Sequence, residues 1–259
     1  DNKLSLGLVE DVLSYTQGDY ECHYYERPWL KILRQLRAGQ EVNLTNLFDR
    51  KLIGNYLYKE LGKKPLKKHE HHLSHAAAGF QTSPFNDATI VIIDAIGEFD
   101  TITIWNAYYD NNGIAKYKKV YSKKYPSSIG LFYTAMTKRV GLQPLDEEYI
   151  LMGMAAYGNP IYSDEMFTEF IHDYNKLEFK KNLHIGIDKN FLPNASDMDI
   201  ASSAQLVIEY LIKLTMSKAK MLGKSNNLVY GGGVALNCLA NRLLGDYYDT
   251  ATTTTNARY

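Results

Sequence analysis

The amino-acid sequence predicts an α/β fold, and three observations carry this prediction. Residues 88–94 are β-branched and almost wholly apolar, which is typical of a strand buried on both faces. A second apolar strand, residues 228–231, runs into a glycine turn and a helical pattern. Helical periodicity occupies the stretches between and around these strands, most clearly at 201–223. Strands alternating with helices indicate an α/β domain.

The N-terminal residues are predicted to be helical. Residues 1–40 carry an apolar stripe with a period of 3.6, and Pro28 stands near a helix start. Residues 43–62 form a further amphipathic pattern that ends near Gly62. A basic face on the helix after Pro28 is interpreted as solvated, with contact to a ligand or another domain as the less favoured alternative. That face consists of Lys31, Arg34 and Arg37.

Histidines are concentrated in one short run. Of seven histidines, four lie at positions 69, 71, 72 and 75. His71 and His75 are four residues apart, so on a helix both rings leave the same face. This spacing allows a helix to bind a transition metal through two imidazoles, a ligand type that suits Fe, Zn, Cu and Ni. A solvated polar helix start is the alternative interpretation.

A carboxylate follows the histidine helix at the end of the first apolar strand. Residues 88–124 are predicted to form a three-stranded meander whose first turn carries Asp94, Gly97 and Glu98. Asp94 together with the two histidines would make a 2-His-1-carboxylate metal set. Asp-x-x-Gly is also an ordinary turn sequence, so both interpretations stay open.

The second glycine turn is a candidate phosphate site. Gly231, Gly232 and Gly233 permit close backbone approach, and the start of the helix that follows favours a phosphate. The run matches neither the Rossmann nor the Walker pattern, and a tight turn is the alternative. Asn237 either hydrogen-bonds a ligand or caps the helix. If a nucleotide approaches Gly232, we expect Gly232→Val to weaken nucleotide binding by more than it lowers stability.

Composition narrows the range of partners and compartments. Lys+Arg and Asp+Glu both number 29 in 259 residues, so we expect no nucleic-acid or membrane partner. Cys22 and Cys238 lie far apart, which indicates reduced thiols and a cytoplasmic protein. The chain has no apolar run of the roughly 18 residues that a membrane span needs.

Taken in order, five motifs resemble one family, the O-carbamoyltransferases of nodulation-factor and antibiotic tailoring. The motifs are HHLSHAAAGFQTSPF, DAIGEFDT, SSIGLFYTAMTKRVG, EEYILMGMAAYG and GGGVALNCLANRLL, within residues 24–160 and 200–244. This family's transfer domain is similar to the tRNA threonylcarbamoyl-transferase. The resemblance implies the two-lobed fold of actin, sugar kinases and heat-shock ATPases, with mixed sheets and a nucleotide between the lobes.

On this resemblance, the parts of the chain have expected places in the fold. Residues 1–160 would form the first lobe, 161–200 an insertion outside the core, and 201–259 the start of an incomplete second lobe. The activating domain, similar to carbamoyl-adenylate synthases, would be absent from residues 1–259. We therefore expect that domain of the same polypeptide as a partner, and no ATP-dependent carbamoyl transfer by this chain alone. A homodimer stays open.

The resemblance also implies an activity and its residues. The family makes carbamoyl adenylate from ATP and carbamoyl phosphate and passes the carbamoyl group to a hydroxyl of a small-molecule acceptor. His71, His75 and Asp94 match ligands of Fe(II) or another divalent metal. Cofactor-binding positions match Gly231, Gly232, Gly233 and Asn237. The resemblance does not supply the base that the acceptor hydroxyl needs; by position the candidates are His72, which points about 100° away from the histidine pair on a helix, and Glu98, four residues past Asp94.

Several departures from the family pattern keep other functions open. A further metal-binding aspartate of the family, in a Gly-Asp-Ala-Gly turn, has no clear counterpart, so neither Asp246 nor Asp249 is assigned. Ala95 replaces a common glycine, and Ile150 a common lysine. A sugar-kinase-like ATP-dependent phosphotransferase and a noncatalytic nucleotide-binding protein are the alternatives. A kinase would not need the histidine pair, which counts against it.

Overall fold

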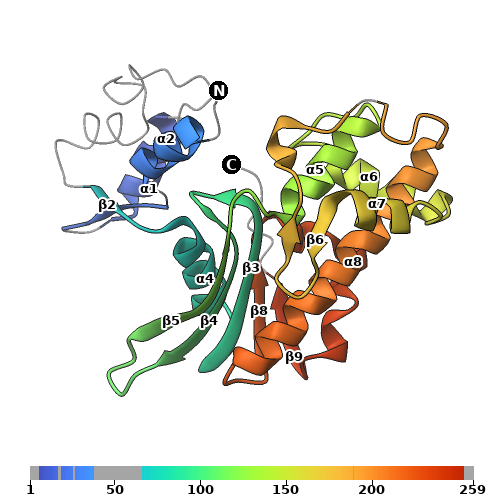
Figure 1. Cartoon of the computed structure of the whole chain (residues 1–259). Coiled ribbons are helices and arrows are strands. Elements are labelled where there is room, and N and C mark those ends of the chain that lie inside the picture. Colours follow the sequence, from blue (N-terminus) through green and yellow to red (C-terminus); the bar gives the residue numbers. More distant parts are fainter. Residues whose placement is uncertain (1–5, 17–18, 26, 38–65, 189, 254–259) are drawn as a thin grey trace. The chain divides into compact units, whose positions relative to one another are not determined.

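The computed structural model describes residues 6–16, 19–25, 27–37, 66–188 and 190–253 (Figure 1). The chain forms two compact units, Asp1–Ser74 and His75–Tyr259. The boundary falls inside helix α4 (His71–Gln81), which is continuous across it. Because α4 is one helix, the positions of its own residues relative to one another follow from helical geometry.

Ahead of α4, the described residues of the first unit form helices α1 (Leu6–Ser14) and α2 (Pro28–Arg37) and a small parallel sheet. Both helices confirm the predicted helical character of this region, and α2 begins at the proline. Strands β1 (Cys22–Tyr24) and β2 (Leu66–Lys68) pair in parallel. Their three-residue length explains why periodicity did not reveal them. The helix predicted at 43–62 lies outside the described residues.

A five-stranded sheet in the order β5-β4-β3-β8-β9 forms the centre of the second unit. Strands β3 (Asp87–Gly97), β4 (Asp100–Tyr109) and β5 (Ala115–Lys124) form an antiparallel meander, as predicted. Strand β8 (Asn227–Gly231) is parallel to β3, and β9 (Thr250–Thr253) is parallel to β8. The sheet is therefore mixed, which confirms the α/β class.

Helices cover both faces of this sheet. Val91 and Ile93 of β3 join the core formed with α5 (Ile129–Arg139) and α8 (Asp197–Leu222). Successive residues of a strand point to opposite faces, so Ile90 and Ile92 point the other way. On that face Phe80 of α4 stacks on Tyr109 of β4, with ring centroids 5.0 Å apart. Figure 1 shows α4 and α8 on opposite sides of the sheet.

The remaining elements lie C-terminal to the meander. They are α6 (Glu148–Met154), η2 (Ala155–Tyr157), α7 (Ser163–Phe170), β6 (Ile171–Asp173), β7 (Glu178–Phe179), η3 (Leu183–Ile185), η4 (Gly233–Leu236), α9 (Cys238–Asn241) and η5 (Leu244–Asp246). Strands β6 and β7 form a separate antiparallel pair.

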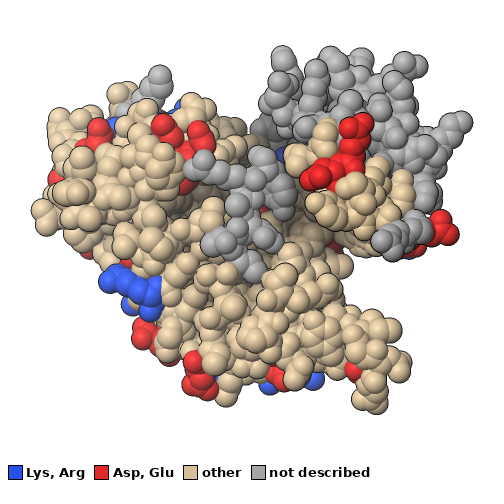
Figure 2. All heavy atoms as spheres, turned by 180° about the vertical axis from the view of Figure 1, so that it is seen from behind, with Lys and Arg blue, Asp and Glu red and all other residues tan. Residues whose placement is uncertain are grey.

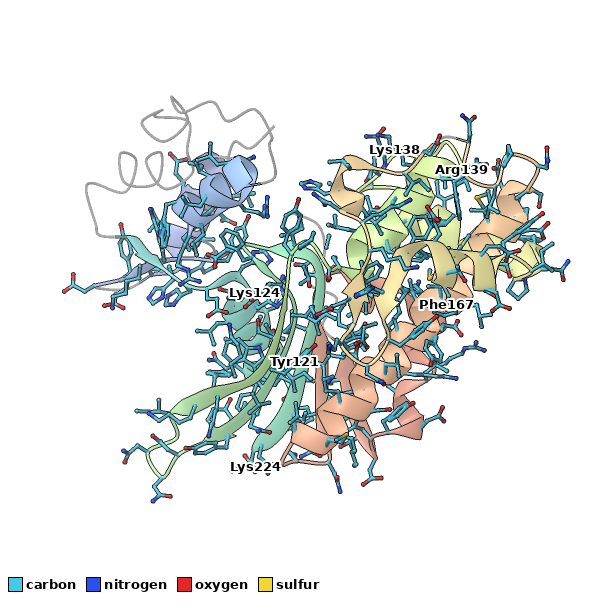
Figure 3. All side chains as sticks on the ribbon, in the orientation of Figure 1. Tyr121, Lys124, Lys138, Arg139, Phe167 and Lys224 are labelled. Carbon is cyan, nitrogen blue, oxygen red and sulfur yellow. The ribbon has the colours of Figure 1, made fainter. Side chains whose placement is uncertain are left out.

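Two features of the second unit differ from what we expected. Residues 161–200, expected as an insertion outside the core, contribute buried apolar side chains to it, and Phe170 of α7 packs on Phe132 of α5. Arg139, labelled in Figure 3, ties α5 to the same segment by donating to the carbonyls of Phe191 and Leu192. A few apolar residues dispersed in a polar stretch leave no periodic signal.

The second difference concerns the pairing of strands. Strand β8 was expected in a second lobe, whereas it pairs with β3 and so lies in the same sheet as the meander. An apolar strand must have both edges paired when it is buried, and β3 and β9 supply the two partners. Periodicity alone does not say which strands are neighbours.

Neither the helices nor the surface charge of the described residues stands out. No helix among them is long and apolar enough to cross a membrane. On the face shown in Figure 2, charged side chains of both signs form small, separate groups.

Candidate metal centre

His71, His75 and Asp94 converge in the structure. Each offers one ligand atom, and these atoms all lie within 4.8 Å of one another. His75 Nε2 and Asp94 Oδ2 are 3.4 Å apart. Within the described ranges, this is the one cluster of three or more histidine, cysteine or acidic residues with such geometry. The three residues named as metal ligands from the sequence are therefore neighbours.

Helix α4 supplies both imidazoles from its first two turns. His71 begins the helix and His75 follows one turn later, with only 6% of its surface exposed. Three alanines follow, and alanine has the highest helix propensity, which favours a regular helix directly after the histidines. The helix therefore holds the two rings on one face in partly buried surroundings.

Strand β3 supplies the carboxylate through its pleat. Asp94 is two residues past Ile92, so alternation places it on the sheet face that α4 covers. Its Oδ1 accepts a hydrogen bond of 2.8 Å from the Ala95 backbone N–H. The regular pairing of β3 with β4 is interrupted between Ile93 and Gly97. Asp94 thus stands where the strand leaves its ladder, a frequent place for a functional side chain.

The start of helix α5 fixes this strand end, a feature that we did not predict. Ser128 Oγ accepts from Leu131 N–H at 3.1 Å as the N-cap of α5 and donates to the Ala95 carbonyl at 2.7 Å. A Cβ at Gly130 would lie 2.7 Å from Ala95 Cα, so only glycine allows this approach. In the sequence, Ser128 and Gly130 at a helix start were the features that could have indicated this contact.

The glycine turn reaches the same strand end from β8. Gly231 is opposite Ile92, and a side chain at Gly232 would collide with the Ile93 carbonyl oxygen. Gly232 also has a φ of 89°, a conformation that other residues rarely adopt. A Cβ at Gly233 would lie 3.2 Å from Asp94 Oδ1. The structure therefore brings the predicted cofactor-binding glycines beside the predicted metal ligand.

Asn237 acts as a helix cap in this structure. Its Oδ1 accepts from Ala240 N–H at 3.0 Å and so caps α9, one of the two roles that the sequence left open. It belongs to a buried polar network with Tyr133, Gln205 and Glu209. Burial raises the pKa of the Tyr133 hydroxyl well above its usual range, and the neighbouring Asn237 side chain offsets part of this rise. A nucleotide contact by Asn237 stays a prediction.

The two candidate bases lie in the elements that carry the ligands. His72 is fully buried in α4, directly after His71. Glu98 is buried in the turn between β3 and β4 and has a φ of 60°, which is uncommon outside glycine. Neither belongs to the cluster of three, and their role stays a prediction.

The donor set fits a divalent transition metal. Two ligands that each lie about 2.1 Å from one ion can be at most about 4.2 Å apart. His75 Nε2 and Asp94 Oδ2 satisfy this at 3.4 Å, and all three ligand atoms lie within 4.8 Å, so a small side-chain adjustment would suffice to hold one ion. Two imidazoles and one carboxylate are the set that binds Fe(II) with coordination positions left open for substrate. A direct hydrogen bond between His75 and Asp94 would also explain their contact, so the metal requires a test.

The chain is similar in sequence to one protein family and to several of its members. The family model described as "Carbamoyltransferase N-terminus" matches residues 10–247. The uncharacterized protein sll1178 of Synechocystis is 35% identical over 215 residues, which are 74% of this chain and 34% of that protein. The nodulation protein NolO of Bradyrhizobium diazoefficiens is 27% identical over 181 residues, 66% of this chain and 32% of NolO. The chain thus spans about a third of these relatives' length.

Among solved structures, the activator of the 2-hydroxyisocaproyl-CoA dehydratase from Clostridium difficile, with bound ADPNP, is similar to this chain. The TM-score is 0.40 and the sequence identity 16%, over 77% of this chain and 72% of that structure.

Proposed function

The chain belongs to the carbamoyltransferase N-terminus family, and from this premise we propose that it carries the site of metal-assisted carbamoyl transfer. The donor would be carbamoyl adenylate and the acceptor a hydroxyl of a small molecule. One observation carries the proposal, namely that His71, His75 and Asp94 converge although the aspartate comes from a different element. A carbamoyltransferase relative with no metal chemistry would have no evident use for this partly buried donor set.

The proposed reaction assigns each group a task. A divalent ion in this site would supply a Lewis acid for the carbamoyl carbonyl. His71, His75 and Asp94 would hold that ion at the end of β3. The acceptor oxygen forms a bond to the carbamoyl carbon, the bond from this carbon to the phosphate oxygen of the adenylate breaks, and AMP leaves. The hydroxyl proton passes to a base, for which His72 and Glu98 are our candidates.

The glycine segment would receive the phosphate of the adenylate. Gly233 lies next to Asp94, and its missing side chain leaves the backbone open to a ligand. A phosphate there would stand beside the metal ligands, as the transfer step requires. We further propose that ATP and carbamoyl phosphate are the precursors and that a separate activating domain of the parent polypeptide joins them.

Metal content tests the centre directly. We expect the purified chain, loaded with Fe(II) under anaerobic conditions, to retain about one ion per chain, and His75→Ala to lose most of it. His172→Ala is the matched control, because His172 is exposed on β6. Elemental analysis after gel filtration is the measurement. Equal metal in wild type and His75→Ala would show that the contact with Asp94 is only a hydrogen bond.

The transfer step is tested with preformed carbamoyl adenylate. The metal-loaded chain should release AMP faster in the presence of hydroxyl compounds, and chelation or His75→Ala should abolish this increase. Formation of ADP from ATP and a sugar would instead support the phosphotransferase alternative. Nucleotide binding without any turnover would support the noncatalytic alternative.

A further inference from the structure

A reciprocal pair of side-chain amides lies behind the glycine segment. Gln205 Nε2 donates to Asn237 Oδ1 at 3.0 Å, and Asn237 Nδ2 donates to Gln205 Oε1 at 2.9 Å. Both residues are buried, with 5% and 7% of their surface exposed. Gln205 belongs to α8 and Asn237 ends η4, so the pair joins a long helix of the core to the short helix after Gly232.

The hydrogen-bonding capacity of Gln205 is fully used. Its Oε1 also accepts from the Tyr133 hydroxyl at 3.0 Å, and its Nε2 also donates to Glu209 Oε1 at 3.1 Å. A primary amide has two donors and two acceptor lone pairs, so Gln205 has no capacity left. A carboxylate only accepts, and therefore Glu209 determines which end of the amide faces it. Arg242 donates to the other oxygen of Glu209 at 2.8 Å and holds that carboxylate in place.

Asn237 is fixed by the same contacts. Its Oδ1 accepts from both Gln205 and the Ala240 N–H, which uses both lone pairs. The oxygen is therefore not open to a ligand while the pair persists. Asn237 fits a role in anchoring the chain better than a role in binding a nucleotide through this oxygen.

Residues 232–237 connect the amide pair to the metal centre. At one end Gly232 packs against the Ile93 carbonyl, and at the other Asn237 is bound to Gln205. Between them, Ala235 N–H donates to the Gly232 carbonyl and Asn237 N–H to the Val234 carbonyl, each at 3.0 Å. A segment held at both ends and bonded internally has little freedom to move. Gly233, which lies against Asp94, belongs to this segment.

We infer that Gln205 is a positioning residue that, through Asn237, holds Gly233 against Asp94 and so sets the position of the carboxylate for the metal. The inference rests on the proposed metal centre, but Gln205 touches neither ligand nor metal. It acts on the backbone segment that packs against Asp94, and Tyr133 and Glu209 orient its amide. Residues that orient a ligand from outside the coordination sphere commonly change metal affinity when they are replaced.

Metal affinity and spectrum test this inference. Co(II) titration, followed by its visible absorption, should show about tenfold weaker binding and an altered spectrum in Gln205→Leu. Thr215→Val is the matched control, because Thr215 is buried in the same helix and bonds only to the Leu211 carbonyl within it. Its Co(II) affinity and spectrum should equal those of wild type. Wild-type Co(II) binding by a folded Gln205→Leu would overturn the inference.

Hydrogen exchange gives a second readout that needs no metal. In Gln205→Leu the backbone amides of residues 233–241 should exchange faster than in wild type, whereas Thr215→Val should leave them unchanged. Unchanged exchange in Gln205→Leu would refute the anchoring role. If wild type bound no Co(II), the proposed metal centre would fail, and exchange alone would decide whether the segment is anchored. If Gln205→Leu does not fold, Tyr133→Phe removes one hydroxyl contact and should give smaller changes of the same sign.

Discussion

At the residue scale, Gly232 is a position where the structure allows only glycine. It has a φ of 89° and a ψ of 170°, a region that only glycine occupies without strain. The direction of a Cβ is filled by the Ile93 carbonyl. Replacement of Gly232 therefore disturbs packing as well as any nucleotide contact, so Gly232→Val does not isolate binding. The turn and the candidate ligand site depend on the same glycine.

This explanation predicts a large stability loss at Gly232. Gly232→Ala should lower the free energy of unfolding by at least about 3 kcal/mol, from backbone strain and overpacking together. Gly113→Ala is the control, because Gly113 has a φ of 72° but nothing within 4 Å of a Cβ. There the loss should be about 1 to 2 kcal/mol, from strain alone. Urea unfolding measures both, and equal losses would contradict the packing role of Gly232.

At the element scale, three elements meet where β3 ends. Helix α4 brings the histidines, β3 the aspartate, and α5 the serine that bonds to the strand end. The cap of α5 and the position of Asp94 thus share one side chain, Ser128. Its hydroxyl accepts from an N–H of the first turn of the helix, which has no partner within the helix, and donates to the Ala95 carbonyl of the strand.

Removal of this hydroxyl should affect both elements. Ser128→Ala should cost about 1 to 2 kcal/mol of stability, as N-cap replacements do, and should also weaken Fe(II) or Co(II) binding several-fold. Ser196→Ala removes the N-cap of α8, where the serine accepts from Asp199 N–H, at a place outside the metal centre. It should cost a similar stability and leave metal affinity unchanged. Equal metal affinity in the two variants would show that α5 does not position Asp94.

At the scale of the whole molecule, buried tyrosines make stability depend on alkaline pH. Burial raises the pKa of Tyr133 and of the fully buried Tyr230 far above the usual value of about 10. The unfolded chain therefore releases these protons at lower pH than the folded chain. Stability is fully present below pH 10 and falls as the pH rises above it, because the unfolded state then binds fewer protons.

The slope of this loss can be predicted. Each of these two tyrosines should contribute about 1.4 kcal/mol per pH unit above pH 10. Tyr230→Phe should remove about half of the slope that Tyr133 and Tyr230 contribute together. Ser128→Ala changes no titrating group, so it should lower the stability but keep the wild-type slope. Urea unfolding between pH 8 and 11 measures the slope. A wild-type slope in Tyr230→Phe would refute the assignment to that residue.

The sequence by itself determined the local features of this protein. Periodicity located the meander, α8 and the strand before the glycine turn, because local side-chain patterns reflect local backbone geometry. Pro28 marked the start of α2. The i,i+4 spacing of His71 and His75 required only that their segment be a helix. Asp94 was found because a carboxylate that ends an apolar strand is locally unusual. The resemblance to a family joined these pieces into one metal site.

Only the tertiary structure decided which distant segments meet. Strand β8 pairs with β3, so Gly232 and Gly233 lie at Ile93 and Asp94 although 139 positions separate each pair in sequence. Gln205 belongs to no motif, and only its buried bonds to Asn237 and Tyr133 give it a role. Such contacts arise when apolar faces pack together, and many pairings of strands and helices satisfy the same local pattern. The choice among them depends on the packing of the whole sheet with its helices.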